Sequence, residues 1–376
     1  MTSKNISRRE LLVGTGAALA SAAWPAGASV GVEADSRAGS AQNSGAGAGF
    51  GEGQQKPNMG SGRARWMQDP RYCWGVMTHY LADWQARVHN LQMSVDQWNK
   101  MVEDFDVEGM AKRLEQAGAG HYQISIGQNS GYYLAPNATY DDIVGEKPSK
   151  CSRRDLVADL YDSLHKRDIK LMVYLPSGAP GQDKPACAKL GWERGPYPNQ
   201  DFQDKWEQVI ADWSRRWGDK VEGWWFDGCY WPNTMYRSAH PPNFFTFAAA
   251  ARAGNSQSAV AFNPGVFTRL IGISPDQDFI AGETNDPEQV NVHYPAEGTV
   301  DGVQIHMLCF LGKTWGMGDP RFETEKVIEY TKKIRDFGGG VTWDVPVELD
   351  GTIKPAFLEQ LEALGKAFPK SSKSAS

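Results

Sequence analysis

Two carboxylate residues stand directly after short apolar segments, where an acid or a nucleophile could act. Asp227 lies in the segment WWFDG, and Glu283 lies in the segment AGET. Burying a carboxylate is costly unless the group is paired or takes part in chemistry. We therefore expect Asp227 to form the centre of an active site. Glu283 is its expected partner, and Glu288 competes for the same role.

Two carboxyl groups that face one cavity have the chemistry of glycoside hydrolysis, in which one acts as nucleophile or base and the other as acid. A separation of about 5 Å gives retention through a covalent intermediate, whereas a wider gap gives inversion. The sequence does not give this distance, so both stereochemical outcomes stay open at this stage.

Polar and aromatic residues in or after the other expected strands could bind sugar hydroxyls or stack on a sugar ring. The residues that we expect to contact substrate are His79, Gln128, Asn129, Tyr174, Asn263, His306 and Trp315. The chain has 14 Trp in 376 residues, which suits a cleft where apolar sugar faces pack on aromatic rings. The alternative for any single Trp is a place in the core.

These residues need a scaffold that brings many strand ends together. Apolar, β-rich segments alternate with segments of helical periodicity. The expected strands are 72–79, 121–126, 170–175, 221–226, 259–262, 279–281, 303–308 and 341–345. The expected helices are 105–118, 152–167 (with Ser152 as N-cap), 201–217, 243–252, 322–337 and 355–368. Eight strands in about 300 residues predict an α/β fold, a single (β/α)8 barrel of the TIM type, with its site at the carboxyl ends of the strands.

Composition narrows the class of partner. The net charge of −6 argues against nucleic acid, because phosphate binding needs a basic face. No segment is long and apolar enough for a membrane anchor. The His residues are scattered without H-x-H or H-E-x-x-H spacing, so we expect neither a metal nor another cofactor. The five Cys residues are expected to be free thiols or core residues, with one disulfide after export as the alternative.

The two ends of the chain are expected to lie outside the barrel. Residues 1–28 contain SRRELL, an apolar stretch and an AGA cleavage pattern, which predict a twin-arginine signal peptide and a periplasmic or extracellular protein. Residues 29–65 are rich in Gly, Ala and Ser, which predicts a flexible linker. Residues 66–368 form the expected catalytic domain, and residues 369–376 form a polar tail. The oligomeric state stays open.

Several motifs resemble the α-L-fucosidase-type glycoside hydrolases, family 29. The segment WFDG at 225–228 matches the nucleophile strand of that family, and WGVMTH at 74–79 resembles its first strand, which ends in a sugar-binding His. KTWG at 313–316 resembles a loop with a Trp-Gly pair. The resemblance covers about residues 70–368, without the C-terminal β-sandwich usual in the family. It implies a retaining mechanism with Asp227 as nucleophile and, on a looser match, Glu283 as acid/base.

Two departures from the family pattern concern the sugar. The family usually has two His after the second strand, where this chain has Gln128 and Asn129, and a usual Glu position holds His306. The leading hypothesis is a retaining exo-glycosidase that releases a terminal sugar, either α-L-fucose or another deoxy or pentose sugar. The alternatives are a barrel that binds carbohydrate without catalysis and a metal-assisted hydrolase on the same scaffold.

Overall fold

The computed structural model describes residues 61–194, 198–230 and 236–370, which all belong to the unit Ala46–Ser376. The predicted signal peptide lies outside the described residues, as do positions 29–60 of the predicted linker and 371–376 of the predicted tail. Among the described helices, none has the length and apolar character needed to cross a membrane.

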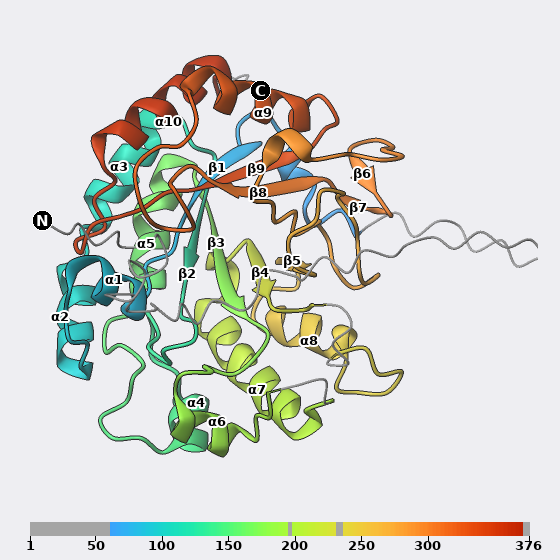
Figure 1. Cartoon of the computed structure of the whole chain (residues 1–376). Coiled ribbons are helices and arrows are strands. Elements are labelled where there is room, and N and C mark those ends of the chain that lie inside the picture. Colours follow the sequence, from blue (N-terminus) through green and yellow to red (C-terminus); the bar gives the residue numbers. More distant parts are fainter. Residues whose placement is uncertain (1–60, 195–197, 231–235, 371–376) are drawn as a thin grey trace, which may run out of the picture. The chain divides into compact units, whose positions relative to one another are not determined.

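Seven parallel strands form one curled sheet in the order β5-β4-β3-β2-β1-β9-β8. They are β1 (Trp74–Thr78), β2 (His121–Ser125), β3 (Lys170–Pro176), β4 (Gly223–Asp227), β5 (Ala259–Phe262), β8 (His306–Phe310) and β9 (Gly340–Asp344). In Figure 1 these strands gather at the centre, with helices such as α3, α5 and α7 outside them. The strands are almost entirely buried, as parallel strands covered on both faces must be. The predicted TIM-type α/β barrel is confirmed.

An irregular segment, 278–284, fills the place between β5 and β8 and closes the barrel. The amide of Asp278 donates to the carbonyl of Val260 in β5 at 2.7 Å, and the amide of Thr284 donates to Leu308 of β8 at 3.0 Å. The segment contains Gly282 with φ of 65°, where a Cβ would collide with the backbone carbonyl of His306. The strand predicted at 279–281 is therefore present as this irregular connection.

The strand predicted at 303–308 is wrong in its bounds, because the chain divides there. Val303–Gln304 forms β7, which pairs antiparallel with β6 (Thr299–Val300) in a separate hairpin. The barrel strand β8 begins only at His306. This shift moves His306 from the interior of the predicted strand to the amino end of the observed one, which decides where its side chain lies.

Ten α-helices are described. They are α1 (Ala82–His89), α2 (Val95–Asp104), α3 (Val107–Ala117), α4 (Ala138–Val144), α5 (Leu156–Leu164), α6 (Lys184–Leu190), α7 (Gln200–Trp217), α8 (Phe244–Ala251), α9 (Thr324–Arg335) and α10 (Pro355–Ala367). Four 3-10 turns are also described: η1 (Arg65–Gln68), η2 (His165–Arg167), η3 (Gly218–Lys220) and η4 (Pro287–Gln289). The six predicted helices correspond to α3, α5, α7, α8, α9 and α10, whereas α1, α2, α4 and α6 were not predicted.

The N-cap of α5 differs from the prediction. The Asp155 carboxylate accepts the Ala158 amide at 3.0 Å and caps the helix. Ser152 donates its amide to the carbonyl of Tyr133 instead, so this part of the chain is tied to the loop after β2. The prediction that Ser152 caps the helix is therefore wrong, because the N-cap lies three residues later and the Ser152 hydroxyl donates to the Arg154 carbonyl at 2.5 Å.

Alternate residues of the strands face two separate cores. In β4, Trp224 packs against Trp217 of α7 with ring centroids 5.7 Å apart, whereas Trp225 faces the barrel interior and stacks on Tyr174 at 5.3 Å. This alternation follows from the two-residue period of a strand. The interior is filled by Met77, Met172, Phe279, Leu308 and several Ala side chains. All five Cys are buried and free.

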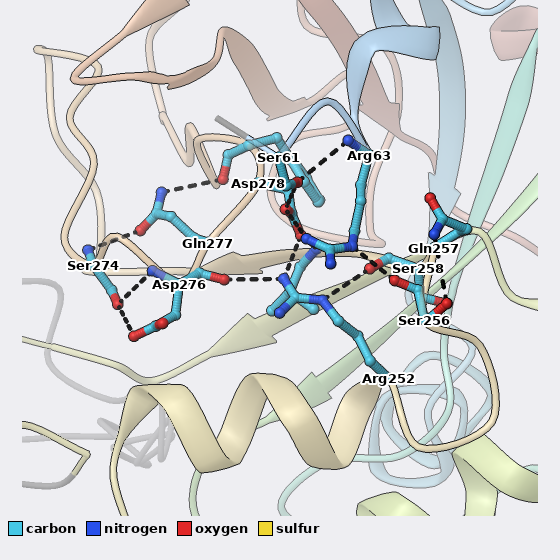
Figure 2. Close-up of polar contacts among 12 residues, drawn as sticks. Ser61, Arg63, Arg252, Ser256, Gln257, Ser258, Ser274, Asp276, Gln277 and Asp278 are labelled. Atoms are coloured by element: carbon cyan, nitrogen blue, oxygen red, sulfur yellow. Dashed lines mark hydrogen bonds and ion pairs between the residues drawn. The ribbon is translucent and has the colours of Figure 1, made fainter. Parts of the chain in front are cut away.

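The base of the barrel, at the amino ends of the strands, holds a buried charge cluster around Asp278 (Figure 2). The Asp278 side chain is only 2% exposed, and it accepts Arg252 Nη2 at 2.5 Å and the Val260 amide at 2.8 Å. Arg63 Nη1 lies 3.4 Å from the same carboxylate, which Ser61 also contacts. The residues before η1 are thereby bound to the base.

Candidate active site

The carboxyl end of β4 places Asp227 in the barrel mouth, where four donors reach its carboxylate. Oδ1 accepts the Gly228 amide at 2.7 Å, Asn263 Nδ2 at 2.8 Å and the Tyr230 hydroxyl at 3.2 Å. Oδ2 accepts the Tyr174 hydroxyl at 2.7 Å. Together these four hydrogen bonds fix the orientation of the Asp227 side chain.

The two tyrosines keep their protons beside this charge. Burial, and then the charge of Asp227, raise the pKa of Tyr174 and of Tyr230 well above the ordinary range. Both hydroxyls therefore act as donors at any physiological pH. Gln128 Nε2 donates to the Tyr174 hydroxyl at 2.6 Å, which connects this predicted residue to Asp227 through one side chain.

Asn263, which follows β5, joins Asp227 to Glu283. Its Nδ2 atom lies 2.8 Å from Asp227 Oδ1 and 2.6 Å from Glu283 Oε2. An amide NH2 group has two hydrogens and can donate to both oxygens at once. Because both oxygens contact one nitrogen, their separation is at most 2.8 + 2.6 = 5.4 Å. The two predicted carboxyl groups therefore face one point in the mouth.

Glu283 differs in protonation from an ordinary carboxylate. Burial and the nearby charge of Asp227 raise the pKa of Glu283 to about 8, although the hydrogen bond from Asn263 opposes the shift. At neutral pH the group carries its proton, since two close carboxylates do not both ionise readily. The alternative, Glu288, lies apart: its side chain is 62% exposed and accepts the Tyr330 hydroxyl at 2.8 Å.

His79 forms the opposite side of the mouth, just after β1. Its Nδ1 lies 2.7 Å from Asp344 Oδ1, so a proton on Nδ1 bonds to that carboxylate. The ring stacks on Trp84 at 4.7 Å and meets the edges of Tyr174 at 5.4 Å and Trp315 at 5.7 Å. Within the described residues Nε2 has no hydrogen-bond partner, so it is available to a ligand.

The loop that carries Trp315 is fixed against this wall by Gly316. The Gly316 amide donates to Asp344 Oδ2 at 2.5 Å. The residue has φ of 59°, and a Cβ would lie 2.8 Å from the Trp84 ring and 2.9 Å from His79 Cβ. Only glycine fits this close approach.

Two predicted residues are not joined to the carboxylate pair. His306 lies in the base, where Nδ1 faces the Ile280 carbonyl at 3.1 Å and Nε2 contacts Thr342 Oγ1 at 2.8 Å. Burial lowers the pKa of His306 to about 4. Asn129 lies near the mouth, but its contact is the carbonyl that accepts the Gln182 amide at 2.9 Å.

Four contributors to the mouth were not predicted: Trp84, Tyr230, Gly316 and Asp344. Asp344 ends β9 as Asp227 ends β4, so the strand-end rule points to it, although it is not among the expected site residues. Tyr230 follows Asp227 by three residues, within the same βα loop. Trp84 and Gly316 carry no sequence signal for their contact, because it joins two distant loops.

No known protein-family profile and no curated protein matches the sequence. Solved structures share the fold. An endo-fucoidan hydrolase of glycoside hydrolase family 107 has a TM-score of 0.62 and 17% identity over 82% of this chain, which spans 54% of that hydrolase. A second one has a TM-score of 0.62 and 14% identity over 82% of this chain and 94% of its own.

Two α-L-fucosidases share the same fold. The enzyme from Lactobacillus casei has a TM-score of 0.54 and 14% identity over 81% of this chain and 98% of its own. A family 29 enzyme from Bacteroides thetaiotaomicron has a TM-score of 0.53 and 16% identity over 85% of this chain and 76% of its own. The fold is therefore one that glycoside hydrolases of two fucose-active families use.

Proposed function

We propose that this protein is a retaining glycoside hydrolase with Asp227 as nucleophile and Glu283 as acid/base. The observation that carries the proposal is the Asn263 nitrogen shared by both carboxyl groups, because it places Asp227 Oδ1 and Glu283 Oε2 at most 5.4 Å apart. Carboxyl groups of retaining glycosidases are about 5–5.5 Å apart, whereas those of inverting enzymes are about 6.5–9.5 Å apart. The short separation supports retention.

The protonation of the pair suits the first step. Asp227 forms a bond to the anomeric carbon while the bond to the leaving oxygen breaks and Glu283 gives its proton to that oxygen. A pKa of about 8 keeps Glu283 protonated for this task at neutral pH.

The second step needs Glu283 as a base. Once Asp227 is an ester, its negative charge is gone, so one cause of the raised pKa of Glu283 is removed. The Glu283 carboxylate then takes a proton from water, the water oxygen bonds to the anomeric carbon, and the bond to Asp227 breaks.

The fold neighbours support an α-L-fucosyl unit as the sugar at Asp227. They are fucoidan hydrolases and α-L-fucosidases, and the Bacteroides enzyme was captured as a covalent intermediate with 2-fluoro-fucosyl fluoride in a Glu-to-Gln variant. In this chain, His79 Nε2 would bind a sugar hydroxyl, and Trp84 and Trp315 would pack beside the ring. We also propose that Asn129 contacts the sugar on this side of the mouth.

The test is hydrolysis of aryl glycosides of α-L-fucose, galactose, arabinose, xylose and rhamnose. We expect turnover of the fucoside and a loss of about 10⁴-fold or more in Asp227→Ala, because the nucleophile is removed. Glu288→Gln is the matched carboxylate control and should retain activity. If no glycoside is cleaved but fucose still binds, the protein is a carbohydrate-binding barrel without catalysis.

We also propose that the protein is exported by the twin-arginine route, on the strength of the SRRELL segment. A fusion of residues 1–65 to a reporter that folds in the cytoplasm would test this. Export that stops when Arg8 and Arg9 are both changed to Lys supports the proposal, and export that continues contradicts it.

A further inference from the structure

A shallow pocket opens beside Glu283, on the side of the loop that follows β5. Glu283, Phe267, Arg269 and Leu270 line it, and Asp227 does not. The pocket therefore borders the proposed acid but not the proposed nucleophile. In a retaining mechanism the acid protonates the leaving oxygen, so the leaving group must lie on the acid's side of the bond.

The backbone of this loop is fixed, while the side chains of residues 266–269 are exposed. The Phe267 amide donates to the Glu283 carbonyl at 3.4 Å. Further along, the Leu270 amide donates to the Asn291 carbonyl at 3.2 Å, and the Asn291 amide donates to the Thr268 carbonyl at 2.6 Å. The Phe267 side chain remains 40% exposed beside the pocket. It can pack on the face of a sugar or aryl ring.

Arg269 is an exposed cation in this pocket. Within residues 61–194, 198–230 and 236–370, its guanidinium forms no ion pair and no hydrogen bond. The other ionisable residue that lines the pocket is Glu283, which is protonated at neutral pH. The formal charge of the pocket is therefore positive.

We propose that this pocket binds the leaving group and that Arg269 selects leaving groups with an anionic substituent, a carboxylate or a sulfate-type group. The inference rests on the proposed function and adds the class of leaving group to it. A guanidinium forms two parallel hydrogen bonds with either kind of anion, which neutral sugars do not offer. Phe267 would hold the ring that carries the anion.

The experiment compares three aryl α-L-fucosides: 4-carboxyphenyl, 4-sulfophenyl and the neutral 4-carbamoylphenyl. The measured quantity is the ratio of kcat/KM for each anionic substrate to kcat/KM for the neutral one. We expect this ratio to fall about tenfold in Arg269→Gln, mainly through KM, because a ground-state contact is lost. Arg269→Lys should restore part of the ratio. Comparison of this ratio for the two anionic substrates shows whether the pocket prefers a carboxylate or a sulfonate.

Arg215 provides the matched control. It is an exposed arginine in the last turn of α7, before β4 begins, and so lies at the base of the barrel. Arg215→Gln should leave the ratio unchanged. An equal ratio in the wild-type protein and Arg269→Gln would overturn the inference while leaving the glycosidase proposal intact.

Binding gives a second measurement that needs no turnover. Calorimetric titration of Asp227→Asn with the 4-carboxyphenyl and 4-carbamoylphenyl fucosides should give tighter binding of the acid, and the difference should vanish when Arg269→Gln is added. A protein without hydrolytic activity that shows this difference would contradict the proposed catalysis but support the pocket. Equal affinities would overturn the pocket.

Discussion

Asp227 and Glu283 share one hydrogen-bond donor, the side-chain nitrogen of Asn263. The nitrogen lies 2.8 Å from one carboxyl group and 2.6 Å from the other, so the two groups are held close while one of them keeps a proton. Their closeness sets the stereochemistry of the proposed reaction, and their unequal protonation sets its pH dependence.

Retention is the stereochemical prediction. Because Asp227 Oδ1 and Glu283 Oε2 are at most 5.4 Å apart, the gap is too short for both a sugar and an attacking water, as inversion requires. Proton NMR during rapid hydrolysis of an aryl fucoside should show the α-anomer of the sugar first, with the β-anomer appearing only by mutarotation. Initial formation of the β-anomer would refute the nucleophilic role of Asp227.

Glu283 should set the alkaline limb of the pH profile. Its pKa of about 8 means that the acid is protonated below this pH and loses its proton above it. We expect kcat/KM to fall about tenfold per pH unit above pH 8. In Glu283→Gln the limb should disappear, and activity should be lost least for a dinitrophenyl glycoside, whose leaving group needs no proton. If the alkaline limb persists in Glu283→Gln, a group other than Glu283 causes it.

Asn263→Ala tests the two hydrogen bonds that join Asp227 and Glu283. Loss of the hydrogen bond that lowers the pKa of Glu283 should move the alkaline limb to higher pH. The rate should also fall by about 10–100-fold, since Asp227 loses a donor. Asn255→Ala, which removes an amide bonded to Val221 in the base, is the control and should leave the limb in place. If the alkaline limb moves to lower pH in Asn263→Ala, its assignment to Glu283 is contradicted.

The base of the barrel should make the fold sensitive to acid. Burial lowers the pKa of His306 to about 4 and of His121 to about 3, from the ordinary 6.5. Below pH 6.5 these two histidines become protonated in the unfolded chain but stay neutral in the folded chain. The free energy of unfolding should therefore fall as pH decreases from about 6.5 to about 4, by roughly 1.4 kcal/mol per pH unit for each histidine.

Urea midpoints across this pH range would check the slope. His306→Asn should be less stable at neutral pH but should show a shallower loss on acidification. His240→Asn, at an exposed histidine, should keep the wild-type slope. Equal slopes in all three proteins would mean that other groups cause the acid sensitivity.

The charge cluster around Asp278 should stabilise the fold. Asp278→Asn leaves an acceptor for the Val260 amide but removes the partner charge of Arg252 and Arg63. Because the carboxylate is buried, we expect a loss of about 2–3 kcal/mol in the free energy of unfolding. The nearby Asp276→Asn, whose carboxylate contacts Ser274, should cost under about 0.5 kcal/mol. A loss below about 1 kcal/mol for Asp278→Asn would contradict its structural role.

Much of the scaffold was predictable because its signals are local. Alternation of apolar and helical segments located all eight barrel positions, seven of which are regular strands, and the strand-end rule located Asp227, His79 and Asn263. The irregular segment 278–284 was harder to describe, because it makes only a few strand-like hydrogen bonds. The bounds of β8 were wrong because Val303–Gln304 pairs within a hairpin, and no local pattern separates that pairing from the barrel strand.

The sequence by itself determined the order of strands and helices and the position of Asp227, since residue periodicity and a charge after an apolar strand are properties of one short segment. Only the tertiary structure decided that Glu283 rather than Glu288 meets Asp227, that Asn263 joins them, and that His306 lies in the base. Each of these outcomes depends on the register with which segments distant in sequence close the barrel. That register is set by packing across the whole sheet, which no single segment encodes.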